Sequence, residues 1–169
     1  MGHYIANLRD IEFCLFDLLQ RDEILGKSIY KDLDRQTIMG MLEEVKRMAE
    51  NDLAASFVDG DQIAVKFDPA TGDAKLPESF KKSYKTFMDN EWWRIDAPVE
   101  LGGTAIPQSV RWAIAEMVLG SNPAIHIYAS GTAFAHVAHV FGTLEQKKIA
   151  KLMVDKPVSY THLTLPTNR

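Results

Sequence analysis

The feature that most constrains the fold is a succession of amphipathic segments in which apolar residues recur every three or four positions. This spacing places apolar side chains along one face of an α-helix. Several segments also begin with a helix-start signal: Asp34, Pro77, Pro107, Pro123, and the pair Thr143 and Gln146. Asp is a preferred N-cap, proline suits a first turn, and T-x-x-Q forms a capping box. The sequence therefore predicts an all-α, bundle-like domain of several helices.

Each predicted helix has residues that we expect to face the core. In the N-terminal part these are Ile5, Leu8, Ile11, Leu15, Leu18 and Leu19 in the helix 5–20, and Ile38, Met41, Leu42, Val45 and Met48 after Asp34. Further along they are Phe80, Tyr84, Phe87 and Met88, then Val110, Ile114, Met117 and Val118, and finally Leu144, Ile149, Leu152 and Met153. Such stripes more often cover the chain's own core than bind a partner helix.

The stretch 58–76, VDGDQIAVKFDPATGDAKL, differs from the rest because it is rich in Gly, Asp and Pro. It contains a short alternating run at 63–67, so we predict an ordered surface linker with one short extended segment. Its aspartates do not follow the ligand spacing of a calcium-binding EF-hand loop. Solvated turn residues explain them better.

Charge and cysteine content narrow the possible functions. The formal net charge is −4, which does not favour a nucleic-acid partner. Cys14 is the only cysteine, so the chain cannot form an internal disulfide or a site of several thiolates. A reducing, cytoplasmic setting follows as an expectation. Because Cys14 lies among Phe13, Leu15 and Phe16, we expect a buried and inert thiol.

The sequence predicts neither a secretory signal at its start nor a membrane-spanning helix. The N-terminus lacks the basic region followed by a continuous apolar region that marks a secretory signal. No apolar stretch approaches the ~18 residues of a membrane-spanning helix.

The predicted helix 123–141, which ends before Gly142, is unusually rich in Ala, Gly, Ser and Thr. Small side chains permit close approach of a neighbouring helix or of a flat or linear ligand. Tight helix packing is the simpler interpretation. His126, His136 and His139 lie on this helix, but no nearby carboxylate completes a ligand set, so we expect no metal site. The residues also show no catalytic motif.

A stiff, apolar connection, EWWRIDAPVELGGTAIP, interrupts the helices at 91–107. In order, it joins a Trp-rich helix end to a helix containing Glu116, which is followed by the small-residue helix and by GTLEQK at 142–147. This order resembles the acyl-CoA dehydrogenase family, whose members carry P-E-x-x-G-G-x-G in the connection and G-T-x-E-Q-K at the later helix. Here Val99 takes the acidic position, Glu100 follows it, and Ala105 replaces the last glycine.

The resemblance implies a fold and an activity. Residues 77–157 look like the family's N-terminal helical domain, and residues 1–57 look like an N-terminal helical extension. Family members dehydrogenate acyl-CoA thioesters at the α and β carbons: a glutamate base takes the α proton and FAD accepts a hydride. The resemblance also implies an electron-transfer flavoprotein as acceptor and a homo-oligomer. The connection would line the route to the flavin, with Trp92 and Trp93 as its apolar wall and Gly102 and Gly103 as hinges.

The resemblance also implies substrate-binding residues on the small-residue helix. They are His126, Ala129, Ser130 and Ala133, which look like counterparts of positions lining the acyl-chain end of the family's cavity. No catalytic residue is assigned, because the family's glutamate base and most flavin contacts lie beyond this stretch of sequence. We therefore expect the chain alone to be inactive.

The final residues, KPVSYTHLTLPTNR, depart from the family. A motif close to L-T-E-P-x-A-G-S-D is expected there, but Leu165 stands in place of Glu and the remainder is missing. We interpret residues 158–169 as non-native sequence; a divergent first β-strand is the alternative. Two other functions remain open: a non-enzymatic helical module that recruits a partner helix, and a relative of the family acting as an acyl-CoA oxidase.

Overall fold

The computed structural model describes residues 2–155, and it is mostly helical. The main helices are α1 (Leu8–Glu12), α2 (Arg35–Met48), α3 (Phe57–Gln62), α4 (Glu78–Asp89), α5 (Gln108–Ser121), α6 (Pro123–Ala129), α7 (Gly131–Phe141) and α8 (Leu144–Asp155). Two short strands, β1 (Lys66–Asp68) and β2 (Asp73–Lys75), pair antiparallel. The predicted all-α, bundle-like class is confirmed.

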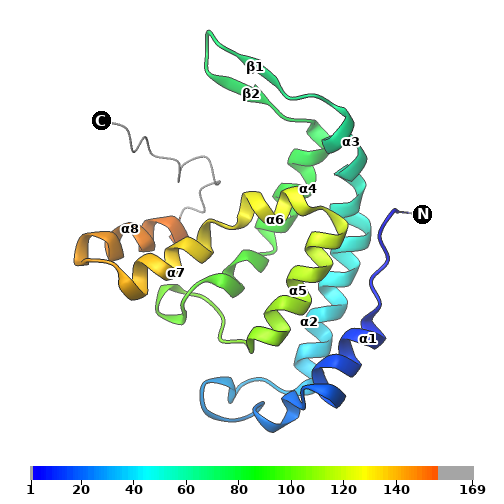
Figure 1. Cartoon of the computed structure of the whole chain (residues 1–169), viewed down its shortest axis with the longest axis vertical. Helices are drawn as coiled ribbons and strands as arrows, with labels where there is room; N and C mark the ends of the chain where they lie inside the picture. Colours follow the sequence, from blue (N-terminus) through cyan, green and yellow to red (C-terminus); the bar gives the residue numbers. More distant parts are fainter. Residues whose placement is uncertain (1, 156–169) are drawn as a thin grey trace.

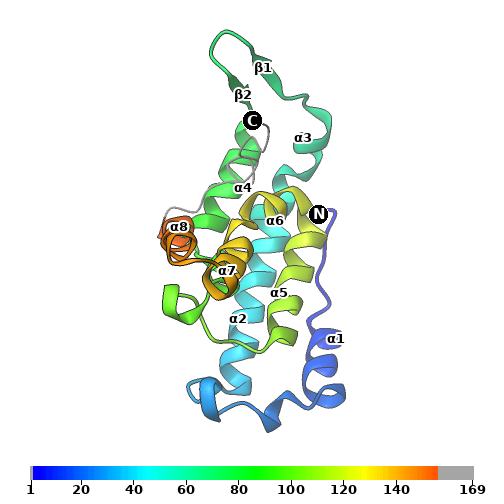
Figure 2. The same cartoon turned by 60° about the vertical axis from the view of Figure 1, so that its left-hand side comes forward.

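The long helices α2 and α5 pack side by side and form the centre of the molecule (Figure 1). Helix α1 lies against the lower part of α2, and α4 crosses behind α6. Helices α7 and α8 pack on each other as an antiparallel pair that extends to one side in Figure 1 and is seen nearly end-on in Figure 2. The β1–β2 hairpin projects beyond the end of the long helices that lies away from α1.

One hydrophobic core joins the N-terminal and C-terminal parts of the chain. Its fully buried large side chains come mainly from α2, α5 and their continuations: Ile38, Leu42, Val45, Met48, Leu53, Val110, Ile114, Met117, Val118 and Ile125. A buried amide closes one end, where Asn122 donates to the Leu53 carbonyl (3.2 Å) and to the Ser56 hydroxyl (3.1 Å). Residues from both 1–57 and 77–155 supply this core. The division into an extension (1–57), a linker (58–76) and a family domain (77–157) stays a prediction.

Helix α2 begins at the predicted cap. The Asp34 carboxylate accepts a hydrogen bond from the Thr37 backbone N–H at 2.7 Å. This bond lowers the pKa of Asp34 from its ordinary value. Because the pKa is lower in the folded chain, the stabilisation is complete above the ordinary pKa of about 3.9 and is lost as the pH falls through the folded value.

We expect Asp34→Ala to lower the melting temperature by about 2–4 °C at neutral pH, since the first turn loses its cap. The difference from the wild type should shrink in acid, below about pH 4. Calorimetric melting of both proteins across this pH range measures it. Asp34→Asn is the control, because asparagine caps about as well as aspartate and should keep most of the stability at neutral pH. An Asp34→Ala protein with unchanged melting at pH 7 would refute the cap.

The predicted helix 5–20 is shorter, and its inward face is narrower. It begins at Leu8, and a π-helical turn over Phe13–Leu18 continues it. This wider turn brings Leu15 and Phe16 into the core but leaves Leu18 and Cys14 at the surface. The prediction of a buried Cys14 was therefore wrong, as were those of buried Ile5, Leu18 and Leu19.

The linker 58–76 has more regular structure than predicted. Helix α3 continues to Gln62, and two extended segments form where one was expected. The hairpin turns at Gly72, whose φ of +76° lies in the left-handed region that suits glycine. The Gly72 N–H donates to the Asp68 carbonyl at 2.8 Å and closes the turn.

The predicted single helix 123–141 is two helices that meet at Ser130. The Ser130 hydroxyl donates to the Ile127 carbonyl at 2.7 Å, and the Ser130 N–H donates to the same carbonyl at 3.2 Å. A serine that takes a carbonyl of the preceding turn competes with the regular helical ladder. The chain therefore changes direction between α6 and α7.

Helix α8 begins at the predicted capping box. The Thr143 N–H donates to the Gln146 side chain at 2.8 Å, and the Gln146 N–H donates to the Thr143 hydroxyl at 3.3 Å. Its buried face was predicted wrongly. Ala150 and Val154 are buried against the core, Met153 is half-buried, and the other three predicted inward residues, Leu144, Ile149 and Leu152, are exposed. In α8 the small residues pack inward and the large apolar ones face out.

Within residues 2–155, every helix is too short or too polar to cross a membrane. The predicted non-native tail, 158–169, lies outside the described residues.

Candidate functional site

The connection 91–107 folds into two tight turns that bring its ends together. A 3₁₀ turn spans Trp92–Asp96 and a second spans Val99–Leu101. The Pro98 carbonyl accepts hydrogen bonds from the N–H groups of Leu101 and Gly103, both at 2.9 Å. Two donors on one carbonyl hold the loop closed without any regular secondary structure.

The two glycines of this loop meet different constraints. Gly102 has a φ of +87°, which favours glycine over any other residue. Gly103 has no room for a side chain, because a Cβ there would lie 1.9 Å from the Ala97 carbonyl oxygen. The double glycine of the motif therefore supplies one left-handed residue and one close backbone approach.

The tryptophans attach the connection to the helical core. Trp93 is buried, and its indole N–H donates to the Met88 carbonyl at 3.3 Å. The buried Thr132 hydroxyl, at the start of α7, donates to the Trp93 carbonyl at 3.2 Å. Trp92 is half-buried. Trp93 thus packs in the core and fixes α7 relative to the loop, whereas the role of the two tryptophans as a wall of the flavin route stays a prediction.

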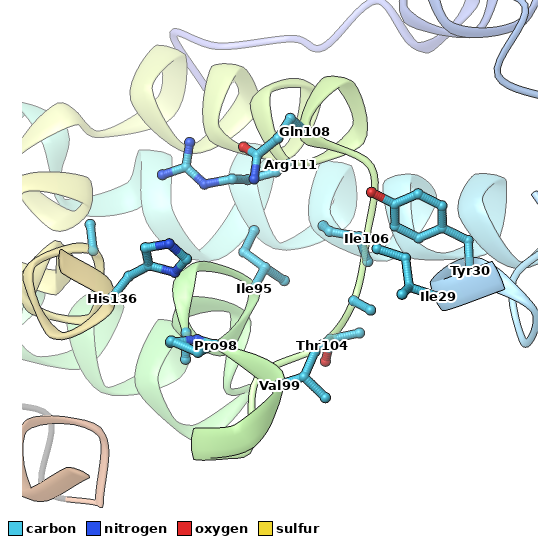
Figure 3. Close-up of a pocket in the computed structure, with 13 residues that line it drawn as sticks. Ile29, Tyr30, Ile95, Pro98, Val99, Thr104, Ile106, Gln108, Arg111 and His136 are labelled. Carbon is cyan, nitrogen blue, oxygen red and sulfur yellow. The ribbon is translucent and has the colours of Figure 1, made fainter. Parts of the chain in front are cut away.

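A pocket of about 360 Å³ lies between the connection, α5 and α7 (Figure 3). Its lining residues are Ile29, Tyr30, Ile95, Ala97, Pro98, Val99, Thr104, Ala105, Ile106, Gln108, Arg111, Ala133 and His136. In Figure 3, Gln108 and Arg111 from α5 and His136 from α7 lie around Ile95 and Ile106, and Tyr30 and Thr104 add two hydroxyl groups to the lining. This size falls within the ordinary range of small-molecule sites, and the accessible lining is polar and apolar in nearly equal parts.

A much smaller hollow, about 20 Å³, adjoins the pocket and shares Ile95 and Arg111 with it. Trp92, Trp93, His126 and Ala129 contribute to its lining. It is large enough for a water molecule at most.

The four predicted substrate-binding residues are divided between these spaces. Ala133 lines the main pocket. His126 and Ala129 line the small hollow. Ser130 lies between them at the junction of α6 and α7, where its hydroxyl donates a hydrogen bond to the Ile127 carbonyl. The break at Ser130 is what separates the four residues, and their role in binding stays a prediction.

Several pocket residues were not singled out from the sequence. Gln108 and Arg111 lie in the first turn of α5, directly after the connection. Because the connection was expected to line the site, this position could have suggested them as lining residues. Ile29 and Tyr30 come from a 3₁₀ turn that is distant in the sequence, and no local pattern marks them.

The polar side chains that line the pocket include Gln108, Arg111 and His136. The Arg111 guanidinium lies 4.6 Å from the centre of the Trp112 ring, in cation–π contact. Among the described side chains that line the pocket, none is an Asp or Glu. Residues 2–155 also contain no group of three His, Cys, Asp or Glu side chains placed to hold a metal ion. The polar and apolar groups of the described wall can contact and orient a ligand.

Two tyrosines outside this pocket, Tyr4 and Tyr84, have raised pKa values. Burial, followed by the nearby charges of Glu116 and Glu50, raises the pKa of Tyr4. Burial alone raises the pKa of Tyr84. Both hydroxyls therefore stay neutral at physiological pH.

No protein-family model matches the chain. Two curated proteins do. Over 156 residues, the chain is 44% identical to the broad-specificity linear acyl-CoA dehydrogenase FadE5 of Mycobacterium tuberculosis, a match that covers 92% of this chain and 26% of that protein. Over 115 residues it is 30% identical to the 3-methylmercaptopropionyl-CoA dehydrogenase of Ruegeria pomeroyi, which covers 68% of this chain and 19% of that protein.

The chain thus spans about a quarter or less of the length of the curated relatives it matches. Both are named as acyl-CoA dehydrogenases, the family indicated by the connection motif and by GTLEQK at 142–147. Their similarity extends over most of the chain. The chain is accordingly homologous to part of the acyl-CoA dehydrogenases and is consistent with an N-terminal fragment of a member of that family.

Proposed function

We propose that this chain forms one wall of the substrate and flavin site of an acyl-CoA dehydrogenase. The observation that carries the proposal is the pocket between residues 97–106 of the connection, α5 and α7, where the family motif and the small-residue helix meet. The reaction of the longer protein would be α,β-dehydrogenation of an acyl-CoA thioester. We further propose FAD as cofactor, an electron-transfer flavoprotein as acceptor, a homo-oligomer and a cytoplasmic setting.

The described residues fit the apolar parts of such ligands. The floor of the pocket would pack against an acyl chain or the edge of a flavin ring, and Gln108 and Arg111 could donate to a carbonyl or ring oxygen. The chain offers no glycine-rich loop for a diphosphate, so that part of FAD and of CoA would be held elsewhere. When bound, the flavin would supply the hydride acceptor.

The chain's own contribution would be orientation of the ligand. The buried Trp93 and the closed loop at Pro98 make one side of the pocket rigid, and the other walls of the longer protein would exclude water. A dry site strengthens electrostatic interactions with a polarised thioester carbonyl. A rigid wall also reduces the entropy lost when a flexible chain is positioned.

An apolar surface on α7 and α8 supports a role within a larger protein. The exposed large side chains there are Phe134, Val137, Val140, Phe141, Leu144, Ile149 and Leu152. Folded monomers rarely leave so many apolar side chains exposed on one pair of helices. We propose that other parts of the longer protein cover this surface. Until they do, the isolated chain should be prone to self-association.

The same surface favours the second candidate, a non-enzymatic module that recruits a partner helix. The two candidates differ in the longer gene product. A flavin-loaded protein that oxidises acyl-CoA supports the enzyme, whereas a partner-binding protein without flavin supports the module. Preference for oxygen over an electron-transfer flavoprotein would identify an oxidase.

The isolated chain 1–169 should not bind FAD tightly, because it supplies only one wall. Titration with FAD, followed by flavin fluorescence and by retention on a sizing column, should give no stoichiometric complex at micromolar concentrations. A tight one-to-one complex would mean that the cofactor site is contained in this chain, which contradicts the proposal.

In the longer protein, Ala133→Leu should reduce kcat/KM for long acyl chains about tenfold or more, because added methylenes would occupy the space of the acyl chain. Short-chain substrates should be affected less. The matched control is Ala55→Leu, the same substitution at an exposed position that does not line the pocket. Equal loss for all chain lengths, or no loss, would remove Ala133 from the acyl site.

A further inference from the structure

The β1–β2 hairpin extends away from the helical body and is exposed along its length (Figures 1 and 2). Its register places Lys66 opposite Lys75, Phe67 opposite Ala74 and Asp68 opposite Asp73. Two of its three cross-strand pairs therefore join like charges. Like charges directly opposite each other destabilise an antiparallel pair. The Asp68 carboxylate also accepts the Ala70 N–H at 2.9 Å within the turn, so it has a local role, but neither lysine gains an attractive cross-strand partner within the hairpin.

The outer edge of β1 is open. The described sheet contains β1 and β2 alone, so each strand has one unpaired edge. The Asp68 carbonyl faces inward, since it accepts the Gly72 N–H at 2.8 Å. Backbone groups alternate in direction along a strand, so the N–H and C=O of Phe67 point to the open edge. The Phe67 side chain is 65% exposed.

The sequence of β1, Lys-Phe-Asp, becomes complementary when it meets a second copy of itself. In an antiparallel pair centred on Phe67, each Lys66 lies opposite Asp68 of the other copy, and the two Phe67 rings lie opposite each other. Both charged pairs are then attractive, and the aromatic pair adds favourable contact. The two Phe67 residues would also exchange backbone hydrogen bonds, as in other cases of strand addition.

We propose that β1 pairs with β1 of a second copy of this chain, which joins the two hairpins into a four-stranded sheet across a two-fold axis. The charge pattern selects this occupant: the same residues that repel within the hairpin attract across the axis. An isologous contact of this kind closes after two copies and does not propagate. The surface is separate from the pocket, so the proposal does not depend on the flavin activity.

Charge reversal at Lys66 provides the test. Lys66→Asp should strengthen the hairpin itself, because position 66 then attracts Lys75. Across the two-fold axis, the new aspartate at position 66 of each copy would lie opposite Asp68 of the other copy, which makes two repulsive pairs. We expect the dimer dissociation constant of the chain 1–169, measured by sedimentation equilibrium at low salt, to rise roughly tenfold or more. The wild-type dimer should weaken as salt is added.

Lys75→Asp is the matched control. It makes the same change in charge and relieves the same repulsion, but from the strand on the far edge of the hairpin. Dimerisation should stay within about twofold of the wild type. If Lys75→Asp weakens the dimer and Lys66→Asp does not, β2 is the interface and the proposal is wrong.

Mixing two variants separates this contact from association through the apolar α7–α8 surface. Lys66→Asp and Asp68→Lys should each fail to pair with themselves, yet they should form a heterodimer because both charged pairs become attractive. The double variant K66D/D68K should regain self-association. Equal association of all variants would place the contact elsewhere. A wild-type chain that stays monomeric at high micromolar concentration and low salt would also overturn the proposal.

Discussion

Gly103→Ala is expected to destabilise the chain by about 3 kcal/mol and to disturb the pocket. A Cβ at this position would lie 1.9 Å from the Ala97 carbonyl oxygen and 2.9 Å from that of Pro98. Both contacts are with backbone, so no flexible side chain can move aside. The loop would have to open, and the hydrogen bond from the Gly103 N–H to Pro98 would be lost or lengthened.

Urea unfolding of the wild type and the variant measures this change. Gly40→Ala is the matched control, since it is the same substitution in the middle of α2, where a Cβ meets nothing within 4 Å. There alanine should raise stability by about 0.5–1 kcal/mol, because it restricts the unfolded chain and favours helix. Opposite signs at the two glycines are expected. A Gly103→Ala variant as stable as the wild type would mean that the loop is not closed as described.

Leu42→Ala should cost about 2–5 kcal/mol of unfolding free energy. The Leu42 side chain is 0% exposed and lies in the core shared by α2 and α5. Removing its terminal carbons leaves a cavity between the two longest helices, in addition to the lost burial of apolar surface. Cooperative unfolding followed by circular dichroism would give the value.

The matched control is Leu144→Ala, the same substitution at a side chain that is 83% exposed. Its effect on unfolding should lie within about 0.5 kcal/mol of zero. The comparison also tests the direction in which α8 packs, because the periodicity alone predicts Leu144 to be buried. A large loss at Leu144 would support that sequence-based orientation and contradict the structure.

The sequence was most informative where a helix start has a specific chemical signature. Asp34 caps α2, Thr143 and Gln146 form the capping box of α8, and Pro123 occupies the first turn of α6. These signals depend on hydrogen bonds within four residues, so tertiary packing changes them little. The inward face of α5 was also predicted correctly, because its apolar residues are buried by α2 on one side.

Other predictions failed where packing partners decide the outcome. In α8, both the small and the large apolar residues form helical stripes, and the contact with α7 selected Ala150 and Val154. The π-helical turn after Glu12 rotated Cys14 to the surface. The break at Ser130 depends on one side-chain hydrogen bond. None of these events has a local sequence pattern strong enough to predict it.

The pocket was predicted in part. The connection 91–107 and the small-residue helix were singled out, and they do come together around Ala133. The contribution of Ile29 and Tyr30 could not be foreseen, because it requires a fold that brings a distant 3₁₀ turn to the loop. The family resemblance indicated the order of the elements. The structure shows which of their side chains line the pocket.

The most direct test uses the longer protein that contains this chain. It should be purified and treated with an acyl-CoA in the absence of oxygen while the flavin absorbance is followed. We expect a bound flavin that bleaches on addition of acyl-CoA, with slower bleaching by long chains in the Ala133→Leu variant. A protein that holds no flavin, or whose flavin stays oxidised with every acyl-CoA tried, would contradict it.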